Sequence, residues 1–209
     1  MITKFYSNKN KTNDTKLHEM RFFAQIAEKA GYTIAGVGSA FMMAGVNGLI
    51  SFGIIMLLFA SLQSQIISLW KIDLTNLSLK ISLGFRMISF GLLCYGLMSN
   101  DFSMMLIGSA FSGLFVGLFW PTFYHLKEES IGNWHLFEKI SGIVLTILTG
   151  ILVIYWNTLY VLIISFTAST IGLILSSKIN NKETNLVEFS EKDTYQNPKL
   201  RLISILDGF

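Results

Sequence analysis

Charged residues are scarce in this 209-residue sequence. They make up 14% of the chain, against about 25% in soluble domains. Hydrophobic residues make up 52%, the mean hydropathy is +0.53, and the apolar residues gather in long runs. Because a helix needs roughly 20 mostly apolar residues to cross a bilayer, the sequence predicts one all-helical membrane domain.

Cysteine is also scarce, since Cys94 is the only one, and no disulfide is expected. The three histidines, His18, His125 and His135, belong to no cysteine–histidine motif of the kind that binds zinc. No phosphate-binding GxxxxGK[ST] loop is present. The net charge of +3 comes from basic residues that flank apolar runs. We therefore expect no enzymatic activity, no metal or other cofactor, and no nucleic-acid partner.

Six apolar runs predict transmembrane helices, because backbone groups in lipid must be satisfied within the segment. We place these helices at about 22–43, 48–70, 79–98, 102–124, 136–156 and 158–177. Short turns are expected at Ala44–Asn47, at Ser99–Asp101 and near Asn157. Residues 1–21 are predicted to form a polar tail and residues 178–199 a polar loop. The apolar stretch at 200–209 is expected to begin a seventh helix, which stops after ten residues.

Lysine and arginine are unevenly distributed between the connections. The tail, the second and fourth connections with their flanks, and the segment after the sixth run carry these residues. The first, third and fifth connections carry none. By the positive-inside rule, we expect a multi-pass protein of the plasma membrane with its tail, its even-numbered connections and its C-terminal segment in the cytoplasm.

Small residues recur at four-residue spacing in two of the predicted helices. Such stripes let helix backbones approach closely. They indicate tight packing or, alternatively, contacts that slide during a transport cycle. The residues are Ser109, Gly113 and Gly117 in the fourth helix, and Gly142, Thr146 and Gly150 in the fifth.

Polar residues follow one face of the first helix at helical spacing: Gln25, Glu28, Tyr32 and Ser39. Ionisable residues within spans usually face the bundle interior or a wet cavity. This stripe and Arg86 in the third helix are therefore candidates for binding a solute or a proton. Each charged residue also has an alternative role. For Glu28 the alternative is a pair with Lys29 at the inner interface, and for Arg86 it is a side chain that extends to the headgroups.

The run GSAFSGLFVGLFWPTFYHLKEE resembles the fourth helix of major facilitator superfamily transporters, and NPKLRLISILDGF resembles the start of their seventh helix. In that family a signature loop joins helices two and three. Within Leu69–Gly84, Asp73 takes the aspartate position and Gly84 the later glycine, whereas the other glycines and the basic residues are replaced. The resemblance makes Asp73 and Gly84 candidates for a gating loop.

The resemblance also implies the architecture and the activity. It implies two inverted three-helix repeats, with helices one and four beside a midplane cavity that a second six-helix half completes. The chain is then expected to be the N-terminal half of a secondary active transporter that moves a small solute by alternating access. The alternative is a stand-alone six-helix membrane protein that acts as a channel, as a scaffold or as a half that pairs with another chain.

Overall fold

The computed structural model describes residues 16–70, 74–126, 132–155 and 157–179. A helical stretch at 16–26 is followed by helices that together make up almost all of the described chain. These are η1 (Ala27–Gly36), α2 (Val37–Trp70), α3 (Asn76–Ser99), α4 (Phe102–Leu126), α5 (Gly132–Tyr155) and α6 (Thr158–Ser176). The described residues contain no strand, so the prediction of an all-helical chain is confirmed for them.

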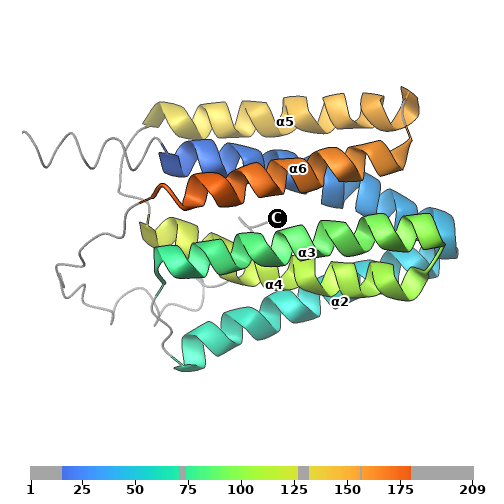
Figure 1. Cartoon of the computed structure of the whole chain (residues 1–209), viewed down its shortest axis with the longest axis horizontal. Helices are drawn as coiled ribbons and strands as arrows, with labels where there is room; N and C mark the ends of the chain where they lie inside the picture. The colour runs from blue at the N-terminus through green and yellow to red at the C-terminus, as the bar shows by residue number, and fades with distance from the viewer. Residues whose placement is uncertain (1–15, 71–73, 127–131, 156, 180–209) are drawn as a thin grey trace, which may run out of the picture.

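The long helical run Lys16–Trp70 is broken inside α2, at Ala44 (φ −138°, ψ 17°) and Gly45 (φ 60°, ψ −148°). If it were straight, this run of 55 residues would be about 80 Å long, far longer than the roughly 30 Å core of a bilayer. The dihedral angles of Gly45 fall in a region open essentially to glycine alone. The glycine permits the chain reversal visible in Figure 1, where the blue segment ends and the cyan segment returns. The break lies within the predicted turn.

Two further turns are very short and are stabilised by caps. Asn100 ends α3 with a left-handed backbone (φ 55°), and the Asp101 carboxylate accepts a hydrogen bond of 2.9 Å from the Ser103 backbone N–H. At the start of α6, the Asn157 side chain accepts one of 3.1 Å from the Leu159 backbone N–H. Caps of this kind contribute about 1 kcal/mol each. They hold α3 against α4, and α5 against α6, as antiparallel neighbours (Figure 1).

Several helices begin earlier than the sequence predicted. The chain is already helical at residue 16, in the segment predicted as tail, because Leu17 and Met20 are buried in a cluster that includes Phe119. The helix α3 begins three residues early, at Asn76, whose side-chain amide donates a hydrogen bond to the Ile179 backbone carbonyl. The helix α5 begins at Gly132, four residues before the predicted position.

Besides a buried apolar core, the helices bury many small polar residues and expose many large apolar ones, which is unusual for a soluble protein. On α6, Ser165 and Ser169 are fully buried, whereas Ile163, Ile164 and Phe166 are exposed. Within the described chain, four helical runs are long and apolar enough to cross a membrane: Lys16–Trp70, Asn76–Ser99, Phe102–Leu126 and Thr158–Ser176. A shorter apolar stretch, Ile140–Val153, lies in α5. These features are compatible with a membrane protein.

The helices pack around η1 and α4. The helix α4 packs against α2 and α3, η1 packs against α5, α6 and α2, and α3 packs against α6. One cluster of buried apolar residues joins η1 to α2, α3, α4 and α6, and a second lies around the C-terminal half of α4. The residues of the candidate site lie where these clusters meet.

Candidate functional site

The site is centred on Arg86, whose side chain is 1% exposed. Arg86 lies about 15 Å along α3, a helix that is about 36 Å long. Its guanidinium is therefore held inside the bundle near the middle of the helix, and it does not extend to either end of the helix. A charge at this depth costs at least about 2.5–3.5 kcal/mol, so it requires favourable partners.

Two aromatic rings supply part of this stabilisation. The guanidinium carbon of Arg86 lies 5.1 Å from the centre of the Phe90 ring and 4.3 Å from that of Phe115. Cation–π contacts are worth about 0.5–2 kcal/mol each. Phe115 also stacks on Phe119 (4.7 Å between ring centres), which stacks on Phe123 (5.9 Å). The sequence analysis missed this column, although the four-residue spacing of its members indicates one face of a helix.

Acidic and hydroxyl groups from η1 complete the surroundings of Arg86. The half-buried Glu28 interacts electrostatically with Arg86, as does Tyr32. Glu28 therefore has an electrostatic partner inside the bundle, on α3. The structure thus brings together Glu28, Tyr32 and Arg86, three of the predicted binding residues.

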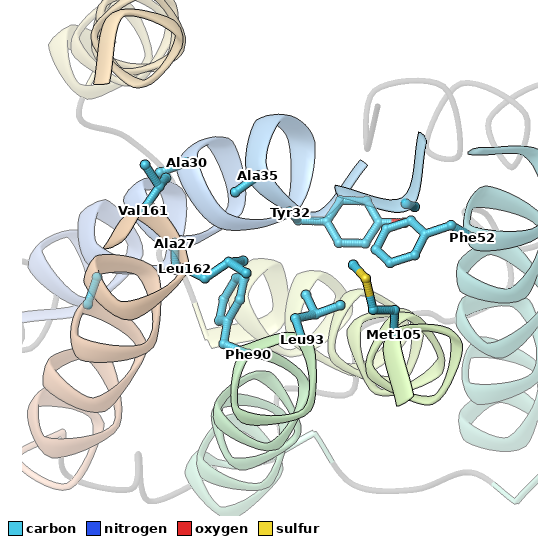
Figure 2. Packing of buried hydrophobic residues seen from close by; sticks show 12 residues of the cluster. Ala27, Ala30, Tyr32, Ala35, Phe52, Phe90, Leu93, Met105, Val161 and Leu162 are labelled. Atoms are coloured by element: carbon cyan, nitrogen blue, oxygen red, sulfur yellow. The ribbon is translucent and has the colours of Figure 1, made fainter. Parts of the chain in front are cut away.

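Tyr32 connects the arginine site to α2 and α4. Its ring stacks on the Phe52 ring at 5.2 Å between centres, as Figure 2 shows. Its hydroxyl lies beside that of Ser109 without hydrogen-bonding geometry and has no hydrogen-bond partner among the described residues. The Ser109 hydroxyl instead donates to the Phe52 carbonyl oxygen at 2.5 Å. The hydroxyl hydrogen of Tyr32 can therefore be donated to an acceptor outside the described residues.

The segment that carries Glu28 and Tyr32 is a ten-residue π-helix. Such helices are rare, mostly a single turn long, and frequent at functional sites. Within this segment, Glu28 and Tyr32 both interact electrostatically with Arg86. Gln25, just before η1, accepts a hydrogen bond of 3.3 Å from Ser141 on α5. Ser39 is fully buried, and its hydroxyl has no hydrogen-bond partner in the described chain. Of the predicted stripe, Gln25 therefore contacts α5, whereas Glu28 and Tyr32 interact with Arg86 on α3.

The small residues of α4 lie against α2. A Cβ at Gly113 would overlap the Met56 backbone oxygen, and one at Gly117 would lie 2.5 Å from the Ala60 backbone oxygen. With Ser109, these residues form the face on which the two backbones approach most closely. Only hydrogen as a side chain fits at Gly113 without movement of α2.

The stripe on α5 is less closely packed. A Cβ at Gly142 would lie 2.7 Å from the Gln25 side-chain nitrogen, whereas one at Gly150 would meet no atom within 4 Å. Thr146 donates a hydrogen bond of 2.9 Å to the Gly142 carbonyl oxygen of its own helix. Of this stripe, Gly142 is therefore the member in close contact with another helix.

The two candidates for a gating loop lie apart from this site. Asp73 lies outside the residues that the structure describes. Gly84 lies on α3, and a Cβ there would meet no atom within 4 Å. Close packing therefore does not require glycine at this position.

The described part of the chain contains no group of three His, Cys, Asp or Glu residues that could hold a metal ion. No protein-family model matches the sequence, and no curated protein or solved structure matches it significantly. The functional argument therefore rests on the geometry of this chain.

Proposed function

We propose that this chain is a multi-pass protein of the plasma membrane with six transmembrane helices. Dividing the first long run at Ala44–Gly45 gives two spans, and α3, α4, α5 and α6 provide four more. Their lengths run from about 28 to about 42 Å at helical rise, comparable to or longer than the roughly 30 Å hydrocarbon core. The turns at Gly45, Asn100 and Asn157 lie at one end of the bundle (Figure 1). These turns carry no lysine or arginine, which supports a cytoplasmic location for the other end and for both termini.

The packing supports two inverted three-helix repeats. Exchanging η1 with α4, α2 with α5, and α3 with α6 relates the main contacts of the bundle to one another, whereas η1·α2 and α5·α6 have no counterpart of comparable extent. The α4·α2 contact corresponds to η1·α5, the α4·α3 contact corresponds to η1·α6, and α3·α6 corresponds to itself. Because η1 and α4 run in opposite directions (Figure 1), this correspondence fits repeats related by an axis in the membrane plane.

The activity that these features favour is secondary active transport of a small solute by alternating access. The observation that carries this proposal is the fully buried Arg86, which interacts electrostatically with the half-buried Glu28. Ionisable residues within spans are expensive, and they mark pathways for substrates, ions or protons. Glu28 and Tyr32 come from η1 and Phe115 from α4, the two central members of the proposed repeats. We propose that the chain works with a second six-helix half in a transporter of the major facilitator type, and not as an enzyme.

The proposal assigns proton coupling to Glu28, which interacts electrostatically with Arg86. The test compares the wild-type protein with Glu28→Gln in vesicles from cells that express the gene. The vesicles are incubated with a panel of labelled sugars, amino acids and carboxylates in the outer solution, with and without a pH gradient across the membrane. We expect at least one solute to accumulate against its gradient in the wild type.

The variant should still exchange that solute but should lose gradient-driven accumulation. Unchanged accumulation by Glu28→Gln would remove Glu28 from the coupling mechanism. A steady ion conductance in planar bilayers would indicate a channel instead.

A further inference from the structure

Arg86 has one edge that nothing in the described structure binds. Its Nε and Nη2 groups are buried and have no hydrogen-bond partner among the described residues. These two nitrogens form the side of the guanidinium from which two parallel N–H groups point outward. A carboxylate binds that side through two parallel hydrogen bonds. The rings of Phe90 and Phe115 contact the guanidinium without offering in-plane acceptors.

Burying charged N–H groups without acceptors is unfavourable, so this edge is best explained by a ligand that is bound during function. The Tyr32 hydroxyl, which also has no hydrogen-bond partner in the described chain, lies within electrostatic range of Arg86. Arg86 and Tyr32 together offer three N–H or O–H donors to one acceptor group. The remaining surroundings are aromatic, provided by Phe52, Phe90 and Phe115.

We propose that the Nε/Nη2 edge of Arg86 binds the carboxylate of a small monoanionic solute with an apolar body, and that Tyr32 donates a further hydrogen bond to it. This inference deepens the transporter proposal and rests on it for the route by which the solute reaches a buried site. The aromatic rings match the apolar body, and the bidentate edge matches the planar carboxylate.

The charge of the site favours a monoanion over a dianion. Arg86 supplies one positive charge, which the carboxylate of a monoanion neutralises. A phosphate dianion brings a second negative charge to a site of low dielectric constant where Glu28 already interacts with Arg86. Each added charge without a counterion is strongly unfavourable in such surroundings.

The test measures binding by the complete 209-residue chain in lipid nanodiscs, by isothermal titration calorimetry. The probes are benzoate, its neutral analogue benzamide, and inorganic phosphate. We expect saturable benzoate binding, at least about tenfold tighter than that of benzamide or phosphate, because only benzoate supplies a planar monoanion.

Three variants test which side chains bind benzoate. Arg86→Lys keeps the charge but loses the fork, and it should weaken benzoate binding by at least about tenfold. Tyr32→Phe should weaken it by about threefold to tenfold through loss of one hydrogen bond. The matched control is Arg21→Lys, because Arg21 also lies over aromatic rings, those of Trp120 and Phe123. This control should bind benzoate within about twofold of the wild type.

The inference is overturned if the wild type does not bind benzoate, binds benzamide equally well, or prefers phosphate. Unchanged benzoate binding by folded Arg86→Lys would also overturn it. If that variant does not fold, as judged by circular dichroism and size-exclusion chromatography, the benzamide comparison and Tyr32→Phe decide the matter. Binding needs no gradient and no second half, so its failure is distinguishable from failure of transport.

Discussion

The guanidinium carbon of Arg86 lies 4.3 Å from the centre of the Phe115 ring, inside the helical bundle. A second ring, that of Phe90, lies 5.1 Å away. These contacts contribute about 0.5–2 kcal/mol each, and at the lower end of that range they do not offset a charge in mid-membrane. The electrostatic interaction with Glu28 adds to these contacts in stabilising the buried charge.

Replacing Arg86 alone should lower the free energy of unfolding more than replacing both Arg86 and Glu28. Arg86→Met removes the positive charge that interacts with Glu28 and should lower the free energy of unfolding by about 0.5–3 kcal/mol. The double variant Glu28→Gln/Arg86→Met should lose less than Arg86→Met, with a coupling of about 0.5–3 kcal/mol. Unfolding by sodium dodecyl sulfate in mixed micelles, followed by circular dichroism, measures both. Strict additivity of the two single changes would show that the pair does not interact.

Close packing of α4 on α2 should make Gly113 intolerant of a methyl group. Gly113→Ala places a Cβ against the Met56 backbone oxygen and should cost about 1–3 kcal/mol of unfolding free energy through overpacking. Gly150→Ala is the matched control, because its Cβ meets no atom within 4 Å. The control should stay within about 1 kcal/mol of the wild type. Equal effects of the two substitutions in the same unfolding assay would contradict this packing.

The sequence predicted the helical class and the position of the break near Gly45, because long apolar runs and the short turns between them are local signals. It left open whether Arg86 faces the interior or the headgroups, because the pattern of one helix does not identify its neighbours. The column formed by Phe115, Phe119 and Phe123 was detectable from its spacing, but its contact with Arg86 depends on how α3 and α4 pack.

The π-helix itself could not be predicted, because the sequence of η1 gives no signal for i→i+5 bonding. The structure places Gln25 against Ser141 on α5, whereas Glu28 interacts with Arg86 on α3. Asp73 lies outside the described residues, so its role stays a prediction.

The proposed orientation in the membrane rests on the absence of lysine and arginine in the odd-numbered connections. In a Cys94→Ser background, single cysteines at Asp101 or Asn157 should react with a membrane-impermeant maleimide added to intact cells. Single cysteines at Lys71 or His135 should react only after the cells are permeabilised. The opposite pattern would reverse the proposed orientation.

The most direct test of transport by alternating access is the two-sided accessibility of a single cysteine beside the arginine site. Ser109→Cys in the Cys94→Ser background replaces the hydroxyl that adjoins Tyr32. A small, cationic methanethiosulfonate is added to right-side-out or to inside-out vesicles. A control cysteine at Ile163, an exposed apolar position on α6, should stay unreactive from both sides because lipid surrounds it.

If the site opens alternately to the two sides, the cysteine at position 109 reacts in both kinds of vesicle, and the protein shows no steady ion conductance. If it reacts from neither side or from one side only, or if it reacts from both sides together with a steady conductance, the protein does not work by alternating access.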